Sequence, residues 1–468
     1  MMDQSNLESI KVAIIKHDSV REGLLEGIKN LGGMSKFVSN EDQVFLKINL
    51  RLPHGFPVNI NFDVAKTLIE LCKEIGVRKI YVGSYPNKEI DTKTLSDMLD
   101  LSRYFKSIGA ELVFLEDHDK FPLISININN KEFKLPEVIL NSDKIISVNQ
   151  ISVDPLFKCT LSLLNSYSIV PYKYQAIQKI VRPGKDYLHL DQYKKDLVSN
   201  ILDVFSIKKP NLVINDMFYI LEGAGPYICK DSQINKTNLL ILGKDAVAVD
   251  TITLKILNVD PLKSDLINES ELRGIGISNL DKINIIGESL NDTLLDVKFC
   301  VNKLEEINLQ NTNIKTGRFC AGCYNKAYHL LNLMKTHMTK DLKYIIKQSF
   351  LIGDKPSEPE NPDNVILFGD CTINSTKEHS FRAITIERAN ILEEAKITLK
   401  RAKKQRFQKK IKQKSNKQIL ELFGCPPEIP YCIKSLLNYY GKSEVPNLNF
   451  YNQLTDTYQI QKTIHKSG

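Results

Sequence analysis

The chain has 468 residues, of which 42% are hydrophobic and 25% are charged, a composition typical of a globular protein with two or three domains. It contains no run of 18 or more apolar residues, and its first residues form neither a basic nor an apolar leader, so the sequence predicts a soluble cytoplasmic protein without a membrane span. Nine cysteines, an odd number, argue against a disulfide framework and for a reducing compartment.

The formal net charge of +8 comes from one segment of the chain. Residues 400–417 contain ten Lys or Arg and no acid, whereas the rest of the chain has 53 basic and 55 acidic residues. Ten cations could bind nucleic acid by neutralising phosphates, but the segment has a single aromatic residue, Phe407, and no base-stacking array. We therefore favour a solvated helix face or a docking stripe for an acidic redox partner.

Apolar runs alternate with amphipathic stretches from residue 11 to residue 151. The apolar runs predict buried strands, and the amphipathic stretches predict helices between them. The strands are expected at 12–15, 44–48, 80–82, 112–115 and 145–148, and the helices at 64–75 and 94–108. This alternation predicts an α/β domain with a largely parallel sheet and flanking helices.

The middle of the chain continues the same pattern. It predicts a helix at 193–205, strands at 212–215, 239–242 and 283–286, a Gly-rich loop at 222–226 and a helix at 246–257. We therefore assign residues 1–301 to one α/β domain and the polar residues 302–316 to a linker.

The C-terminal part predicts a smaller α/β or α domain over residues 317–444. A helix is expected at 324–338 and a strand at 365–368, just before Cys371. Residues 381–423 contain neither Gly nor Pro and are good helix formers, which predicts a long basic helix. Residues 445–468 are polar and predict a loosely ordered tail.

Polar side chains follow several of the predicted strands. Lys47 and Asn49 end the second strand, Asp216 follows the strand at 212–215, and Asp245 and Asp250 follow the strand at 239–242. Because ligands of open parallel sheets bind at the carboxyl ends of strands, these residues are candidate ligand contacts. Asp245 has an alternative role, since it directly precedes a predicted helix and is placed to cap it.

The loop at 222–226 places Glu222 beside Gly223 and Gly225, glycines that would let a ligand approach the backbone. Asp216, Glu222 and Asp250 together predict either a divalent-cation site or an acid and a base, although an exposed turn would explain Glu222 equally well. The sequence has neither a G-x-G-x-x-G fingerprint nor a phosphate loop, so we assign no NAD or ATP site.

Four cysteines near the C-terminal end predict a metal centre: Cys320, Cys323, Cys371 and Cys425. The first two are separated by two residues, and the last is followed directly by Pro, both of which are typical of 4Fe-4S ligands. Zinc is the alternative. We favour the cluster because zinc ribbons usually pair two C-x-x-C knuckles, and this chain has only one.

Four stretches of the chain resemble the family catalogued as domain of unknown function 362: residues 44–49, 158–165, 215–226 and 242–250. The resemblance spans roughly residues 11–286. We expect Lys158, with Lys47, to supply positive charge to the site, Lys158 as a catalytic residue beside Asp216, Glu222 and Asp250, and Asn165 to contact the substrate. The family is often joined to iron–sulfur modules, which the resemblance leads us to expect here. One departure is Leu164, where family members usually have a lysine.

The cysteine segments are similar to the proximal-cluster motifs of nickel–iron hydrogenase small subunits. This resemblance implies that the four cysteines ligate a 4Fe-4S cluster that relays electrons between partners. Tyr324 replaces the acidic residue that commonly follows the first pair, and Cys432 is a possible alternate ligand. We therefore expect a redox-active iron–sulfur protein. The alternatives are a zinc protein whose basic helix binds nucleic acid, and a divalent-metal enzyme with a structural cluster.

Overall fold

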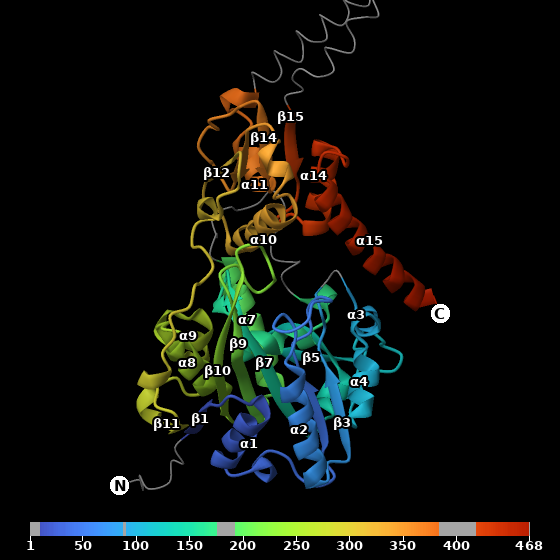
Figure 1. Cartoon of the computed structure of the whole chain (residues 1–468), viewed down its shortest axis with the longest axis vertical. Coiled ribbons are helices and arrows are strands. Elements are labelled where there is room, and N and C mark those ends of the chain that lie inside the picture. The colour runs from blue at the N-terminus through green and yellow to red at the C-terminus, as the bar shows by residue number, and fades with distance from the viewer. Residues whose placement is uncertain (1–9, 88–89, 176–191, 383–417, 468) are drawn as a thin grey trace, which may run out of the picture. The chain divides into compact units, whose positions relative to one another are not determined.

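Residues 10–87, 90–175, 192–382 and 418–467 are described by a computed structural model (Figure 1). The chain divides into two units. Unit 1 comprises Met1–Lys179, Lys195–Cys300 and Asp456–Gly468. Unit 2 comprises Ile180–Lys194 and Val301–Thr455. Each contains its own sheet with flanking helices, so the α/β class predicted from the sequence is confirmed.

Unit 1 is built on a nine-stranded sheet with the order β11-β1-β10-β9-β7-β2-β3-β4, in which β8 pairs with β7. Its strands are β1 (Ile10–Lys16), β2 (Gln43–Lys47), β3 (Lys79–Gly83), β4 (Glu111–Leu112), β7 (Lys144–Asp154), β8 (Lys158–Cys159), β9 (Leu212–Glu222), β10 (Gln233–Gly243) and β11 (Ile283–Gly287). Apart from β8 and β10, which pair antiparallel with their neighbours, the strands of this sheet pair in parallel. A separate antiparallel hairpin joins β5 (Leu123–Ile128) to β6 (Lys131–Pro136).

The α-helices of unit 1 are connections between these strands. They are α1 (Val20–Asn30), α2 (Phe62–Ile75), α3 (Thr92–Leu99), α4 (Leu101–Ser107), α5 (Glu137–Leu140), α6 (Ser162–Ser166), α7 (Gln192–Ile207), α8 (Ala246–Ile256) and α9 (Asp265–Leu272). Short 3-10 turns lie at Met34–Lys36, Tyr167–Ile169, Tyr172–Tyr174, Pro261–Lys263, Leu280–Lys282 and Asn291–Thr293.

Helix α2 shows how the sequence specifies this packing. Asn61 caps its start by accepting a hydrogen bond from the Asp63 amide, and Gly76 ends it in a left-handed conformation. Val64, Leu68 and Cys72 recur at a spacing of four and are all buried. They belong to the same hydrophobic cluster as the strand residues Val44, Leu46 and Val82. The apolar stripe therefore fixes which face of α2 covers the sheet.

Unit 2 is built on a four-stranded, fully parallel sheet with the order β12-β13-β14-β15. Its strands are β12 (Thr312–Thr316), β13 (Gln348–Ile352), β14 (Asn364–Phe368) and β15 (Gln418–Leu422), and its α-helices are α10 (Ala321–His337), α11 (Asp370–Ser375) and α14 (Ile429–Tyr440). Short 3-10 turns lie at Leu304–Ile307 and Asp341–Lys343. Helix α15 (Pro446–Ser467) follows α14 in the chain. Leu351, Leu367 and Phe381 are fully buried in the core of the unit.

Several predicted elements differ from the structure. The single helix predicted at 94–108 is two helices, because Asp100 adopts a left-handed conformation with φ of 56°. The linker predicted at 302–316 contains β12, whose backbone pairs with β13. The tail predicted at 445–468 contains α15, and Leu448 anchors its start by being buried.

The long basic helix falls mostly on residues that the structure leaves undescribed. Residues 383–417, which include the basic segment 400–417, lie outside the described residues. The end of the predicted helix, at residues 418–422, is strand β15 instead, because its backbone pairs with β14. The docking and nucleic-acid hypotheses for 400–417 therefore stay predictions.

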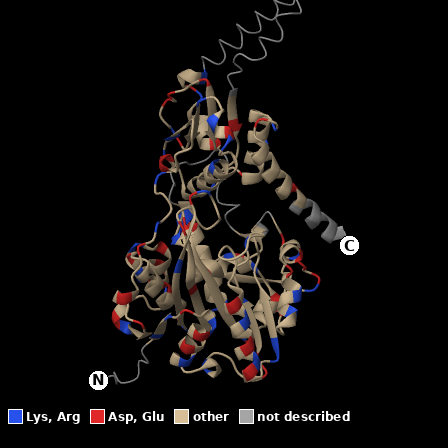
Figure 2. Ribbon diagram, in the orientation of Figure 1, with Lys and Arg blue, Asp and Glu red and all other residues tan. Residues whose placement is uncertain are grey.

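Charged residues are spread over unit 1. Figure 2 shows basic and acidic residues interspersed on the helices and loops. The central strands β2, β7 and β9 also carry charges, among them Lys47 and Asp216. A search of the described residues found no helix with the length and apolar character needed to cross a bilayer.

Candidate functional site

The sheet of unit 1 changes direction between β2 and β7. From β2 the chain proceeds outward through β3 to β4, and then returns to the other side of β2 to form β7 and β9. All these strands are mutually parallel, so their carboxyl ends share one edge of the sheet. In open α/β sheets the crevice at such a reversal is the usual ligand site. The reversal therefore directs attention to the ends of β2 and β7.

Three of the predicted ligand contacts meet at this reversal. Lys47, the last residue of β2, donates from Nζ to Asn165 Oδ1 at 2.7 Å and to the Ile48 carbonyl at 2.8 Å. Asn49 Nδ2 donates to the same Asn165 oxygen at 3.0 Å. Only 3% of Lys47, 6% of Asn49 and 7% of Asn165 is exposed. Residues from a strand end, a loop and α6 thus form one buried polar cluster.

The cluster continues across the sheet through residues that the sequence analysis missed. Asn165 Nδ2 donates to Asn149 Oδ1 at 2.6 Å, and Asn149 Nδ2 donates to Asn215 Oδ1 at 3.0 Å. Asn215 Nδ2 in turn donates to Asp250 Oδ1 at 2.9 Å. Asn149 and Asn215 interrupt otherwise apolar strand runs, and that interruption was the available signal in the sequence. We call Lys47, Asn49, Asn149, Asn165, Asn215 and Asp250 the buried polar network.

Asp250 holds α6 in place. Its two carboxylate oxygens accept from the backbone amides of Ser162 and Leu163, each at 3.0 Å, at the start of that helix. Burial raises the pKa of Asp250 to about 6, and the hydrogen bonds from Asn215 and from these amides oppose the rise. Since α6 carries Asn165, Asp250 positions the residue that contacts Lys47.

Asp216 points away from the buried polar network. Adjacent strand residues face opposite sides of a sheet, so Asp216 faces α2 while Asn215 faces Asp250 on α8. Its Oδ1 accepts from the Phe218 amide at 2.9 Å, and its Oδ2 is buried without a hydrogen-bond partner in the described part of the chain. Burial raises the pKa of Asp216 to about 7, against lowering by the Phe218 amide and the Asn61 side chain.

Glu222 has a third, separate environment. It ends β9, and its Oε2 accepts from the Lys298 amide at 3.2 Å. Asp216, Glu222 and Asp250 therefore share no hydrogen-bond partner, and the structure gives each carboxylate a different set of contacts.

The two glycines after Glu222 are required by the backbone. Gly223 has φ of 84°, and a Cβ there would lie 2.2 Å from the Asp231 carbonyl oxygen. A Cβ at Gly225 would lie 2.6 Å from the Val153 carbonyl oxygen. Close packing of the chain on itself accounts for both glycines.

The last two predicted contacts of unit 1 lie outside the buried polar network. Asp245 accepts from the Ala248 amide at 3.0 Å and from the Ile277 amide at 3.2 Å, so it caps α8. Lys158 is exposed, and its Nζ lies 6.0 Å from the centre of the Phe299 ring.

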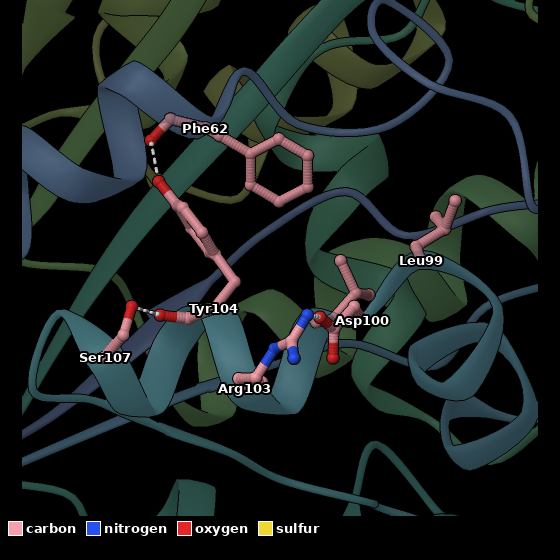
Figure 3. Close-up of a pocket in the computed structure, with 7 residues that line it drawn as sticks. Phe62, Leu99, Asp100, Arg103, Tyr104 and Ser107 are labelled. Carbon is pink, nitrogen blue, oxygen red and sulfur yellow. Dashed lines mark hydrogen bonds and ion pairs between the residues drawn. The ribbon is translucent and has the colours of Figure 1, made fainter.

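One pocket of unit 1 contains none of the predicted site residues. Its volume is about 520 Å³, and it lies against α2 and α4 (Figure 3). Tyr104 donates to the Phe62 carbonyl at 3.2 Å, and Arg103 pairs with Asp100. These polar groups satisfy one another, so the pocket offers a ligand mainly apolar surface.

The four predicted metal ligands of unit 2 lie in the loops and first helical turns that follow its parallel strands. Cys320 caps α10 after β12, and the Cys323 amide donates to its Sγ at 3.5 Å. Cys371 lies in the first turn of α11, directly after β14, and Cys425 follows β15. Because the carboxyl ends of parallel strands share one edge, the fold places all four cysteines at that edge.

Two contacts draw the last two loops together. Asp370 Oδ1 accepts from the Gly424 amide at 2.9 Å, and the Asp370 amide donates to the Gly424 carbonyl at 3.1 Å. A Cβ at Gly369 would lie 3.6 Å from Cys323 Sγ and 3.6 Å from the Gly424 carbonyl oxygen. The missing side chain of Gly369 therefore leaves space beside the Cys323 thiol.

The thiols of this edge influence one another. Contact with the Cys323 thiol lowers the pKa of Cys320 to about 6 and also lowers the pKa of Cys371. The same contacts, together with burial, raise the pKa of Cys323 well above its ordinary value. Burial, then the charges of Cys320 and Cys371, raises the pKa of Cys425 to about 12.

Each of these contacts joins two thiols. Within residues 10–87, 90–175, 192–382 and 418–467, no three His, Cys, Asp or Glu side chains form a group that could hold a metal ion. Cys432 is fully buried in α14, where burial raises its pKa to about 12. All nine thiols are free of disulfide bonds.

Comparisons with known proteins bear mainly on unit 1. No curated protein matches the chain. A structure of a Thermotoga maritima protein is 12% identical with a TM-score of 0.26, and the match covers 47% of this chain and 56% of that one. Residues 44–255 match the family described as "Domain of unknown function (DUF362)". The resemblance predicted for this region is therefore confirmed, and the matched span contains the whole buried polar network.

Proposed function

We propose that the protein is a redox-active iron–sulfur protein whose four cysteines Cys320, Cys323, Cys371 and Cys425 hold a 4Fe-4S cluster. The observation that supports the proposal is that these cysteines follow strands of the parallel sheet of unit 2, at the edge where the carboxyl ends of the strands lie. When bound, such a cluster accepts and releases single electrons.

Three features of unit 2 support this proposal. The donors are thiols, the soft ligands that iron–sulfur clusters use. The glycine at position 369 leaves space beside Cys323 Sγ that a Cβ would fill. The Asp370 hydrogen bond to the Gly424 amide fixes the loop that carries Cys425 relative to the turn that carries Cys371. A ligand set drawn from three loops needs such fixed loops, because each thiol must keep its position.

The buried polar network of unit 1 belongs to the same proposal as a ligand site. Lys47, Asn49 and Asn165 supply hydrogen-bond donors and an acceptor at the reversal of the sheet, where a redox substrate would bind. We do not extend the proposal to a divalent cation at Asp216, Glu222 and Asp250, because the contacts of these three carboxylates are separate.

The test is anaerobic purification of the full chain, followed by visible absorption spectroscopy and assays of iron, sulfide and zinc. We expect a brown protein with about four irons and four sulfides, and we expect Cys371→Ser to lose both. Cys72→Ser, which alters a buried thiol of unit 1, is the matched control and should keep the full cluster. A colourless protein with about one zinc would sink the electron-transfer proposal and favour a structural zinc site.

A further inference from the structure

We propose that the reversal of the sheet in unit 1 binds the anionic group of a small molecule, a phosphate or a carboxylate. Arg51 and the neighbouring Lys47 would bind this group. This inference deepens the proposed function by naming the class of ligand. It rests on that proposal only for the existence of a ligand site in unit 1, and not on the cluster of unit 2.

Neither Lys47 nor Arg51 has a carboxylate in direct contact among the described residues. Lys47 Nζ donates to two neutral oxygens, those of Asn165 and the Ile48 carbonyl. Arg51 Nη1 has a long contact of 3.5 Å with the Ser152 hydroxyl. Among the ion pairs formed by the described residues, none joins Lys47 or Arg51 to a carboxylate. Two neighbouring cations without such a partner are costly inside a protein.

Electrostatics support the same conclusion. Burial, and then the charge of Arg51, lowers the pKa of Lys47 well below its ordinary value. Burial also lowers the pKa of Arg51, although Tyr227 and Asp154 oppose this effect. A bound anion would stabilise the charged form of both side chains.

Asp154 is the nearest acidic group to consider, and it has a structural role of its own. Its Oδ1 accepts from the amides of Leu156 at 2.9 Å and Phe157 at 2.8 Å, which closes the turn between β7 and β8. This carboxylate oxygen is therefore committed to the turn, while its charge still acts on Arg51 through space.

The backbone around Arg51 is held in place on both sides. The Arg51 amide donates to Asn59 Oδ1 at 2.7 Å, and the Arg51 carbonyl accepts from the Asn87 amide at 3.1 Å. Asn87 in turn donates to the Tyr227 hydroxyl at 2.8 Å, which links this loop to the segment after the Gly-rich loop. A fixed backbone at Arg51 lowers the entropy that anion binding would cost, because only the side chain has to be ordered.

The alternative explanation is that Lys47 only completes the interior. A buried lysine with two hydrogen bonds can persist without a ligand. The two explanations differ over Arg51, which is partly exposed and whose guanidinium has a long hydrogen bond of 3.5 Å to the Ser152 hydroxyl. The experiment therefore rests on Arg51.

The test is isothermal titration calorimetry on the full-length protein with sodium phosphate and, separately, with sodium succinate, both at constant ionic strength. We expect at least one of them to bind, and Arg51→Met to weaken its affinity by about ten- to a hundredfold, because a charge-assisted hydrogen bond is lost. Arg51→Lys, which keeps the charge, should retain part of the affinity. The matched control is Arg103→Met, which removes an exposed arginine of the same unit.

If only one of the two titrants binds, that result identifies the anionic group as a phosphate or as a carboxylate. Binding of neither anion above the chloride background, or equal weakening by Arg51→Met and Arg103→Met, would overturn the proposal. Lys47→Met is a second variant, and a failure of this variant to fold leaves the Arg51 comparison intact. Iron and sulfide are assayed on the same samples, so loss of the cluster and loss of anion binding are separate results.

Discussion

The polar groups of unit 1 and the thiols of unit 2 are held in place by different means. Each member of the buried polar network has protein partners at ordinary hydrogen-bond distances, including the amides of Ser162 and Leu163. The thiols of unit 2 contact one another and nearby backbone amides, and thiols are weak donors and acceptors. Ordinary hydrogen bonds thus fix the polar side chains of unit 1, whereas weaker contacts hold the thiols of unit 2.

The largest expected effect is a loss of stability when Asp250 is removed from the buried polar network. Asp250→Ala leaves the amides of Ser162, Leu163 and the Asn215 side chain without their acceptor inside the core. We expect the free energy of unfolding to fall by about 4 kcal/mol, measured by urea denaturation. Asp119→Ala, at an exposed position, is the control and should change it by less than about 0.5 kcal/mol. Equal effects of the two variants would show that the network does not depend on Asp250.

A second effect concerns the pH dependence of stability at Asp216. The pKa of this carboxyl is about 7 in the fold against an ordinary 3.8, so the folded state binds the proton more tightly than the unfolded state. Its contribution to stability is present below pH 3.8 and is lost as the pH rises to about 7. Asp216→Asn does not titrate, so it should gain stability relative to wild type by about 3 kcal/mol between pH 4 and pH 8.

The measurement for Asp216 is chemical denaturation of both proteins across that pH range. Asp119→Asn serves as the control, because an exposed carboxyl should leave the pH profile of wild type unchanged. A constant difference between Asp216→Asn and wild type at every pH would contradict the raised pKa.

The smallest expected effect concerns unit 2. Asp370→Ala removes the acceptor of the Gly424 amide and loosens the loop before Cys425. We expect a loss of about 1 kcal/mol in the free energy of unfolding and, if the cluster proposal holds, faster release of iron to a chelator. Glu378→Ala, at an exposed position of the same unit, should change neither. Unchanged iron release in Asp370→Ala would indicate that the loop does not need this contact.

The sequence was informative where local periodicity decides the structure. The strands at 44–48, 145–148 and 212–215 lie within β2, β7 and β9 apart from a residue at one end, because buried parallel strands read as apolar runs. Strand order, by contrast, depends on contacts between distant segments. Helix boundaries near Asp100 and strand β15 were also set by backbone conformation and pairing rather than by helix propensity.

For the candidate site, the sequence determined which polar residues end the strands, and the structure shows that three of the candidates, Lys47, Asn49 and Asn165, are hydrogen-bonded to one another. The sequence also determined the number and the spacing of the cysteines in unit 2. Only the tertiary structure decided that Asp216 and Asp250 face opposite sides of the sheet, and that Arg51 and Asn149 lie at its reversal. The physical reason is that the sequence gives the type of each residue directly. The side of the sheet that a side chain faces, by contrast, depends on strand register and on the order in which distant strands pair.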